Sequence, residues 1–339
     1  MQRYNATVIA PCRNEINYID SFIESLQKQT VFETTEFIIA DGLSDDGTKE
    51  KLLSYSSVFN NIIVVDNPKK IVSTGLNLAV AEAKNKIIIR MDIHSEYDIS
   101  YIQNSINCLL SKDAQCVGGP WIAKSENSKQ RAIAASFQSK WVVGGAKSRD
   151  LNYSGEVDTV YLGCWWKDYL LKIGGFDENL VRNQDDELCM RIRLDGKKIF
   201  QDPSIKSFYY PRSNFRDLFK QYMQYGFWKV FIIKKYGKAP SYRHIALILF
   251  FNIQLISLIL SPYSNFMMYF SIASLMSYFL FISMVSISIS FKVYKTRFYY
   301  LITSIFFMHF SYLIGMLYGI ILSLKSKEKL TKSMNKLSR

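Results

Sequence analysis

Three polar clusters in the N-terminal part of the chain each come directly after a short apolar run. The clusters are Pro11–Glu15, Asp41–Ser44 and Asp92–His94. Runs of this kind, alternating with helical patterns, are typical of the parallel strands of an α/β sheet. Ligands of such sheets bind beyond the carboxyl ends of the strands. We therefore expect the three clusters to form one site.

The third cluster combines an aspartate and a histidine one residue apart, Asp92 and His94. Both side chains can reach one divalent cation, and such a cation would neutralise a diphosphate. Aspartate is also common at strand ends, so this pair by itself does not establish a metal site. Arg90 lies inside the preceding apolar strand, and a charge in that position needs a partner. The partner is either a phosphate or a nearby carboxylate.

The second cluster offers both a binding and a structural role. Asp41 can accept hydrogen bonds from a base or a ribose hydroxyl. Ser44 or Asp45 is a good N-cap for the helix that follows. The two roles are compatible with each other.

A fourth polar segment, Gln184-Asp185-Asp186-Glu187, opens a helix that ends near Leu194. Acidic residues in a first turn favour the helix dipole, which is a purely structural role. Three in succession exceed what the dipole requires. One that faces a cleft can act as general base for an acceptor hydroxyl.

The elements that must position these residues follow from the apolar periodicity. Strands are predicted at 6–10, 37–40, 62–65 and 87–91, and helices at 18–27, 46–53, 76–83 and 186–194. This order predicts βαβ units and a mainly parallel sheet. Residues 214–235 are predicted to form an aromatic, lysine-rich amphipathic helix. It either lies in a membrane interface or packs back on the α/β head.

Two blocks further along the chain contain no Asp, Glu, Lys or Arg, from Ile245 to Phe291 and from Phe298 to Leu324. A membrane span needs ~20 apolar residues. The first block is long enough for two spans, with a turn at Pro262. We expect about three hydrophobic helices, near 245–261, 266–291 and 298–324, within a membrane region at 244–324.

The net charge of +13 is unevenly distributed. Residues 212–243 carry eight Lys/Arg and one Asp, and residues 245–339 carry nine Lys/Arg and one Glu, so the head is slightly acidic. This pattern suits contact with anionic lipids of the cytoplasmic leaflet and argues against nucleic-acid binding. Residues 1–20 show no signal peptide, so we expect a cytoplasmic head. The five cysteines have no zinc or C-x-x-C spacing and are expected to be reduced, buried thiols.

The topology of the membrane region stays open. Three spans would leave the basic tail, residues 325–339, on the outside, against the positive-inside preference. Either one block is re-entrant or interfacial, or the preference does not hold here.

Taken together, the motifs resemble the family 2 inverting glycosyltransferases of GT-A fold, over roughly residues 4–210. Pro11-Cys12-Arg13-Asn14-Glu15 is similar to the opening Pro-x-x-Asn-Glu turn, and the segment from Ala40 to Thr48 to the Asp-Asp-Gly-Ser nucleotide segment. Asp92-Ile93-His94 takes the place of Asp-x-Asp, and Gln184–Leu188 that of Glu-Asp-x-Asp-Leu. The similarity is greatest to the succinoglycan-type β-glycosyltransferases, which also carry membrane tails.

The resemblance implies roles for individual residues. It places the nucleotide-sugar, with uridine as the expected base, against Pro11, Arg13, Glu15, Asp41, Ser44, Arg90 and Asp92. It assigns Mg²⁺ or Mn²⁺ to Asp92 and His94. It makes Asp185 the catalytic base, with Asp186 as rival because Gln184 stands where Glu is usual. Trp165, Trp166 and Gln184 are candidates for contact with the acceptor, although core packing suits at least one of the tryptophans equally well.

The resemblance also predicts the reaction. It is the transfer of one sugar from a UDP-sugar to a polyprenyl-diphosphate-linked saccharide, in cell-surface polysaccharide synthesis. The segment from Gln221 to Tyr225 lacks the Gln-x-x-Arg-Trp of processive synthases, which favours a single addition. The alternatives are a nucleotidyltransferase and a non-catalytic sugar- or nucleotide-binding membrane protein. The predicted organisation is a GT-A head at 1–211, a basic interfacial segment at 212–243, and the membrane helices. We expect a multi-pass protein of the cytoplasmic membrane, with its head facing the cytoplasm.

Overall fold

The computed structural model describes residues 4–239, 241–293 and 296–324. The predicted basic tail at 325–339 lies outside these ranges. The chain divides into two compact units, one formed by residues 1–122 and 150–209 and the other by residues 123–149 and 210–339. Residues 123–149 therefore group with the C-terminal helices and not with the sheet.

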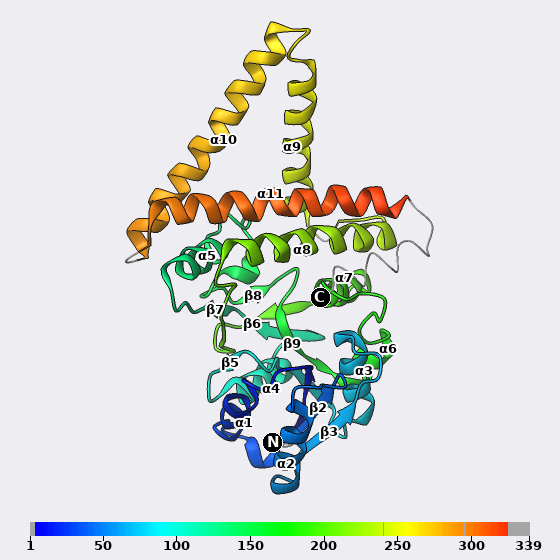
Figure 1. Cartoon of the computed structure of the whole chain (residues 1–339). Coiled ribbons are helices and arrows are strands. Elements are labelled where there is room, and N and C mark those ends of the chain that lie inside the picture. The colour runs from blue at the N-terminus through cyan, green and yellow to red at the C-terminus, as the bar shows by residue number, and fades with distance from the viewer. Residues whose placement is uncertain (1–3, 240, 294–295, 325–339) are drawn as a thin grey trace. The chain divides into compact units, whose positions relative to one another are not determined.

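The first unit is built on an eight-stranded mixed sheet of order β3-β2-β1-β4-β9-β6-β10-β8 (Figure 1). A small second sheet has the order β5-β11-β7. The strands of the large sheet are β1 Ala6–Cys12, β2 Glu36–Asp41, β3 Ile62–Asp66, β4 Ile87–Arg90, β6 Cys116–Gly119, β8 Gly155–Glu156, β9 Tyr161–Trp166 and β10 Ile199–Gln201. The strands of the small sheet are β5 Glu96–Tyr97, β7 Trp121–Ala123 and β11 Ser207–Tyr209.

Helices cover both faces of the large sheet. They are α1 Ile19–Gln27, α2 Thr48–Val58, α3 Val72–Glu82, α4 Tyr101–Ser111, α6 Lys167–Lys172 and α7 Gln184–Leu194, with a 3₁₀ turn at Phe32–Thr34. Side chains alternate along β1, because successive residues of a strand point to opposite faces. Val8 packs with α1 and α4 in one core. Ile9 packs with α3, α6 and α7 in the other.

The α/β prediction for the head is confirmed. Strands β1 to β4 pair in parallel, in the order that the predicted βαβ units require. Strand β9 then runs antiparallel to both β4 and β6, which makes the sheet mixed. The helix predicted at 76–83 begins four residues earlier, at Val72, and the strand predicted at 87–91 ends at Arg90.

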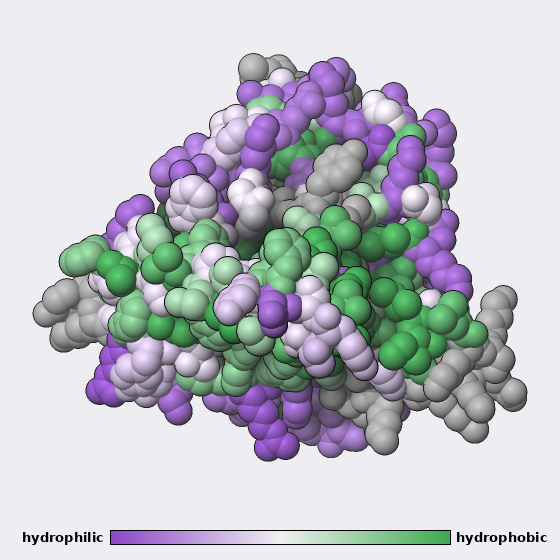
Figure 2. Space-filling model, turned by 90° about the horizontal axis from the view of Figure 1, so that it is seen from above, coloured by the Kyte–Doolittle hydropathy of each residue, from purple (hydrophilic) through white to green (hydrophobic). Residues whose placement is uncertain are grey.

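Apart from Ala123 at the end of β7, the elements described in the second unit are helices, among them a 3₁₀ helix at Lys147–Arg149. Its helices are α5 Ser128–Gln138, α8 Phe215–Tyr236, α9 Tyr242–Leu260, α10 Asn265–Lys292 and α11 Phe298–Ser323. Helices α10 and α11 are long and apolar enough to cross a membrane, whereas the apolar part of α9 is the shorter stretch Ala246–Leu260. Figure 2 shows apolar side chains gathered over the helices of this unit.

Glycines bring α8 and α11 into backbone contact. A Cβ on Gly315 would lie 1.9 Å from the carbonyl oxygen of Met223, and one on Gly226 would lie 2.0 Å from that of Tyr312. Small residues allow this approach in helix pairs of membrane proteins. Replacing Gly315 by Val should therefore force the helices apart.

We expect Gly315→Val to destabilise the helix pair by about 1–3 kcal/mol, as overpacking does elsewhere. Thermal unfolding of the detergent-solubilised protein, followed by limited proteolysis within α8, measures the effect. Ile320→Val, at a position 40% exposed on the same helix, is the matched control. An unchanged melting temperature for Gly315→Val would contradict the close contact.

Candidate functional site

The three polar clusters predicted to form one site come together at one edge of the large sheet. In the parallel register, Cys12 pairs with Asp41 and Ile9 pairs with Arg90, so β1, β2 and β4 end side by side. The chain then leaves the sheet with Arg13–Glu15, Gly42–Ser44 and Asp92–His94. This placement agrees with the rule that ligands of such sheets lie beyond the carboxyl ends of the strands.

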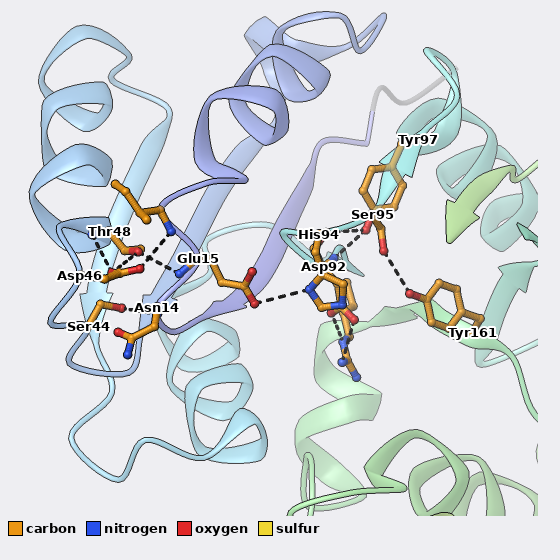
Figure 3. Close-up of polar contacts among 12 residues, drawn as sticks. Asn14, Glu15, Ser44, Asp46, Thr48, Asp92, His94, Ser95, Tyr97 and Tyr161 are labelled. Atoms are coloured by element: carbon orange, nitrogen blue, oxygen red, sulfur yellow. Dashed lines mark hydrogen bonds and ion pairs between the residues drawn. The ribbon is translucent and has the colours of Figure 1, made fainter. Parts of the chain in front are cut away.

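Hydrogen bonds lock the loop after β1 to the loop after β2 (Figure 3). The Asn14 backbone N–H donates to Ser44 Oγ (2.9 Å). The Asn14 side chain donates to Asp45 Oδ1 (2.9 Å), and the Asp45 backbone N–H donates back to Asn14 Oδ1 (3.1 Å). The Glu15 backbone N–H donates to Thr48 Oγ1 (2.9 Å). Asn14 has a φ of 55°, a conformation that asparagine tolerates better than most residues. The asparagine of the opening motif therefore holds the two loops together.

Asp41 is fully buried and shapes its own loop. The Ser44 backbone N–H donates to its Oδ2 (3.0 Å), and the Ser44 hydroxyl donates to its Oδ1 (2.5 Å). The N-cap prediction for Ser44 or Asp45 is wrong, because the N-cap position of α2 is occupied by Gly47. The backbone of Gly47 has a left-handed conformation (φ 91°), and the helix begins at Thr48. Asp46 instead accepts from the Thr48 backbone N–H (3.0 Å) at the start of the helix.

Arg13 lies across Gly42. A Cβ on Gly42 would come within 3.1–3.3 Å of three carbons of the exposed Arg13 side chain. A side chain at position 42 would require this arginine to shift. The glycine and the arginine therefore form one feature of the loop, beside the partly buried Pro11.

Arg90 connects two of the candidate acidic residues. Its side chain is buried, with 6% of its surface exposed. Its Nε donates to Asp92 Oδ1 (3.0 Å) and its Nη2 to Asp92 Oδ2 (3.4 Å), while Nη1 donates to Asp185 Oδ1. Of the two partners that the sequence left open for Arg90, the structure contains the carboxylate. The start of α7 is thereby held beside the end of β4.

The pKa values of this group follow from burial and from the neighbouring charges. Burial raises the pKa of Asp185, Arg90 opposes this, and Asp92 and Asp186 add to it, so that the pKa reaches about 6. Burial acts to lower the pKa of Arg90, but Asp185 and Asp92 more than offset this and raise it. Arg90 thus stays charged, while Asp185 titrates near neutrality. A pKa in this range suits a general base.

The other residues at the start of α7 have different surroundings. Glu187 is fully buried and bonded to Arg191, with distances of 2.9 Å and 2.7 Å from Nε and Nη2 to its two oxygens. Arg191 also donates to the carbonyl oxygens of Ile173 and Gly175, so this pair ties α7 to α6. Gln184 is buried and Asp186 is half-buried. Among the three acids, Asp185 is the one bonded to Arg90.

Two tyrosines and a serine that the sequence analysis missed surround Asp92 (Figure 3). The Tyr97 hydroxyl accepts from the Asp92 backbone N–H (2.6 Å) and donates to its carbonyl oxygen (3.1 Å). Ser95 Oγ lies 3.2 Å from the Tyr161 hydroxyl. These contacts fix the turn that carries Asp92 and His94. No motif marks Tyr161 in the sequence, because its proximity arises only from the pairing of β9 with β4.

The two tryptophans proposed for acceptor contact lie elsewhere. Trp165 is 1% exposed and packs edge-on against Phe176 in the core between the sheet and α3, α6 and α7. Trp166 pairs with Ile87, at the start of β4, and packs against Tyr4. Because β9 is antiparallel to β4, both tryptophans lie at the strand end away from Arg90. Trp165 is thus a core residue, whereas Trp166 is half-buried.

The donor atoms near Asp92 fit a divalent cation only in part. His94 Nδ1 lies 3.5 Å from Glu15 Oε1, and both Asp92 oxygens accept from Arg90. Within the described residues, no group of three His, Cys, Asp or Glu side chains is placed to hold a metal ion. Mg²⁺ is commonly held by one or two protein carboxylates together with substrate phosphates. Asp92 and His94 suit a site of that kind, which the diphosphate of a donor would complete.

Known proteins are similar to this chain in sequence and in fold. Residues 7–168 match the model of the family "Glycosyl transferase family 2". The succinoglycan biosynthesis protein ExoA of Rhizobium meliloti (strain 1021) is 29% identical over 243 residues, which cover 71% of this chain and 74% of the relative. A second relative, from Methanococcus voltae, is a dolichyl N-acetyl-α-D-glucosaminyl phosphate 3-β-D-2,3-diacetamido-2,3-dideoxy-β-D-glucuronosyltransferase. It is 26% identical over 238 residues, which cover 68% of this chain and 74% of the relative.

Among solved structures, the mannosyltransferase PcManGT of Pyrobaculum calidifontis, in complex with GDP-Man and Mn²⁺, superposes with a TM-score of 0.62. The two chains are 15% identical, and the superposed region covers 94% of this chain and 87% of the mannosyltransferase. At this identity the similarity concerns the fold alone. The chain carries a glycosyltransferase family 2 domain on a GT-A-like fold, and it is a glycosyltransferase homologous to the succinoglycan biosynthesis protein.

Proposed function

We propose that the chain transfers one sugar from a nucleotide-sugar, a UDP-sugar by our expectation, to a polyprenyl-diphosphate-linked saccharide, with inversion at the anomeric carbon. The observation that carries this proposal is the contact of Arg90 with both Asp92 and Asp185. This contact holds Asp92, which would face the diphosphate of the donor, beside Asp185, which would be the base. Both lie at the carboxyl ends of the strands.

The donor would bind against the interlocked loops after β1 and β2. Arg13 offers an exposed cation at this edge, and Pro11, Glu15 and Ser44 line the same two loops. Asp41 acts mainly through Ser44, because both its oxygens accept from that residue. Asp92 and His94 would face the diphosphate. A bound Mg²⁺ or Mn²⁺ would neutralise charge that develops on the leaving diphosphate.

Asp185 would act on the acceptor. Its carboxylate accepts the proton of the acceptor hydroxyl while that oxygen forms a bond to the anomeric carbon. The bond from this carbon to the diphosphate oxygen breaks on the opposite side. An α-linked donor then yields a β-linked product in one displacement, without a covalent enzyme intermediate. Arg90 keeps Asp185 oriented for this step.

The relatives support a lipid-linked sugar as the acceptor and polysaccharide synthesis as the setting. By its name, the Methanococcus voltae enzyme acts on a dolichyl N-acetylglucosaminyl phosphate. The Rhizobium meliloti protein is named for its part in succinoglycan biosynthesis. The apolar helices of the second unit would keep the enzyme at the membrane that contains such an acceptor, which raises its effective concentration. We place the catalytic unit on the cytoplasmic side.

The test is transfer by the full-length, detergent-solubilised protein. UDP- and GDP-sugars are supplied with Mn²⁺ or Mg²⁺ and synthetic polyprenyl-diphosphate saccharides, and the anomeric configuration of the product is read by NMR. A single β-linked addition is expected. An α-linked product would overturn the inverting mechanism, and extended chains would overturn the single addition.

The pH dependence of transfer should report the ionisation of Asp185. Its pKa is raised to about 6, and the base must be ionised, so kcat/KM should fall as the pH drops below about 6. The fall should approach tenfold per pH unit. Asp186→Asn, which removes a neighbouring negative charge, should keep this acid limb and move it slightly to lower pH. A kcat/KM that stays level down to pH 5 would rule out Asp185 as the titrating base.

The metal role of His94 makes a separate prediction. His94→Ala should weaken the Mn²⁺ or Mg²⁺ activation constant by about tenfold or more, as losses around metal sites do. The effect can also be read without turnover, as loss of metal-dependent UDP binding in calorimetry. His94→Asp supplies a carboxylate ligand in place of the imidazole and should recover metal-dependent binding. Equal UDP affinity with and without metal, in wild-type protein, would remove the metal from this site.

A further inference from the structure

Helix α11 has the length and the apolar composition of a membrane span, but its packing within the second unit argues against that placement. Half of its most apolar window is buried against other helices. Its neighbours include α8, α5 and a loop that follows α5. The chemistry of these neighbours decides at what depth in a membrane α11 can lie.

Helix α8 accompanies α11 along nearly its whole length. The Phe215 ring packs against Tyr300 near the start of α11, with centroids 5.7 Å apart. Gly226 meets the backbone of α11 at Tyr312, and Lys234 Nζ donates to the Ser323 carbonyl oxygen (2.6 Å) at its end. The two helices are therefore parallel neighbours, and one cannot cross a membrane without the other.

Helix α8 is too highly charged to cross. It contains six charged residues, which are Arg216, Asp217, Lys220, Lys229, Lys234 and Lys235. Each Lys or Arg near the centre of a bilayer costs ~2.5–3.5 kcal/mol on insertion scales. A helix of this composition is typical of a membrane surface. Its exposed cations Arg216, Lys220, Lys234 and Lys235 can face anionic headgroups there, whereas Lys229, Phe227 and Trp228 are buried in the protein.

The middle of α11 also contacts irregular backbone. His309 Nε2 lies 3.2 Å from the carbonyl oxygen of Val142, in the loop after α5. Near the start of α11, Lys129 of α5 lies 6.0 Å over the Tyr300 ring. If α11 spanned the membrane, this loop would lie at the depth of the hydrocarbon core. Irregular backbone is tolerated there only when protein or water surrounds it.

The α9–α10 hairpin has the opposite character. No charged residue lies between Ile245 and Phe291. Large apolar side chains are more than half exposed on both helices, among them Ile256, Ile259, Met276 and Leu280. Its buried polar groups bond to each other across the hairpin. Gln254 Nε2 donates to Ser271 Oγ (2.6 Å), and Ser274 Oγ donates to Gln254 Oε1. Polar side chains paired between helices in this way are tolerated in lipid.

We propose that the α9–α10 hairpin alone enters the bilayer, from one side, while α8 and α11 lie together along the surface of that same side and contact anionic lipid. Figure 1 shows the hairpin leaving the α8–α11 pair in one direction. Both ends of the hairpin and both ends of α11 then stay on one side of the membrane. Arg243, Lys292 and Arg297, at the open end of the hairpin, lie on that side too.

This arrangement removes the conflict that three spans create. With α11 on the surface, the basic residues after it remain on the same side as those of α8. The charge distribution then agrees with the positive-inside preference without an exception. The inference concerns the membrane contact and does not depend on which sugar or acceptor the enzyme uses.

Labelling of single cysteines with an impermeant maleimide tests the proposal, in sealed inverted vesicles and in spheroplasts. The added cysteines are Val58→Cys in the sheet unit, Leu324→Cys after α11 and Tyr263→Cys in the hairpin turn, at positions 69%, 82% and 86% exposed. The wild-type protein, with its five buried thiols, gives the background. Leu324→Cys should react from the same side as Val58→Cys. Tyr263→Cys should not react from that side.

Two outcomes would overturn the proposal. Reaction of Leu324→Cys from the side opposite Val58→Cys would make α11 a span. Reaction of Tyr263→Cys from the Val58 side would mean that the hairpin does not enter the bilayer. Transfer activity of each variant shows that it is folded, since none of the three positions lies in the proposed catalytic site.

Spin-label depth provides a second measurement in vesicles that contain phosphatidylglycerol. Labels at Tyr299, Phe310 and Ile321 of α11 should report one shallow depth, and a label at Met276 of α10 should lie deeper. A spanning α11 would instead give its greatest depth at Phe310 and shallow values at both ends. That pattern would overturn the proposal independently of the maleimide experiment.

Discussion

Replacing Asp185 by Asn should lower kcat by about 10²–10⁴-fold, the usual contribution of a general base. The amide cannot accept the proton of the acceptor hydroxyl, although it keeps the shape of the carboxylate beside Arg90. Donor binding should change little, because the donor is expected to lie against the loops after β1 and β2. The measurement is transfer from a radiolabelled nucleotide-sugar, with kcat and donor KM determined separately.

The loss should not come from unfolding. The pKa of Asp185 is raised in the folded protein, so its charged form is less favourable there than in the unfolded chain. Above its pKa the ionised residue costs folding free energy, and a neutral Asn removes that cost. We expect an unchanged or slightly higher melting temperature at pH 7. Asp186→Asn is the matched control, and if it were the variant that lost activity, the assignment of the base would move to Asp186.

Replacing Arg90 by Met should have the largest effect on stability near the site. The change removes a buried cation and leaves Asp92 and Asp185 as neighbouring carboxylates without it. Breaking a fully buried ion pair costs ~3–5 kcal/mol. Here about 2–3 kcal/mol is expected, because the Asp185 side chain remains 28% exposed. Transfer at pH 7 should fall by about 10²-fold, as expected when a reacting group loses its position.

The pH profile of Arg90→Met separates this role from a general folding defect. Arg90 acts to lower the pKa of Asp185, so its loss should raise that pKa and move the acid limb of kcat/KM to higher pH. The double variant Arg90→Met, Asp185→Asn should recover part of the lost stability, since it removes one of the two unpaired carboxylates. An unshifted acid limb in Arg90→Met would contradict the proposed coupling.

The sequence by itself determined the class of fold and the general location of the site. Short apolar runs of strand length alternate with helical patterns over the head, and burial of such runs leaves an α/β sheet as the stable arrangement. Asp41, Arg90 and Asp92 sit at strand ends, so the parallel register alone brings them together. The ordered motifs, from Pro11 to Asp185, then indicated the family.

The tertiary structure decided which side chains meet. Arg90 required an anionic partner, and only the packing of α7 against the sheet selected Asp185 and left Glu187 to bind Arg191. Trp165 and Tyr161 belong to the same strand, β9, but its antiparallel direction places the tyrosine near Asp92 and the tryptophan away from it. Strand direction and long-range pairing are not encoded in any local pattern.

The membrane region shows the same division. Composition marked α9, α10 and α11 as apolar, because hydropathy measures what a helix contains. Hydropathy cannot measure what a helix packs against. A membrane-spanning helix and a surface helix that is partly buried by its neighbours can therefore have the same composition. The contacts of α11 with the charged helix α8 and with the Val142 carbonyl exist only in the folded unit. They are the observations on which the proposed surface position of α11 rests.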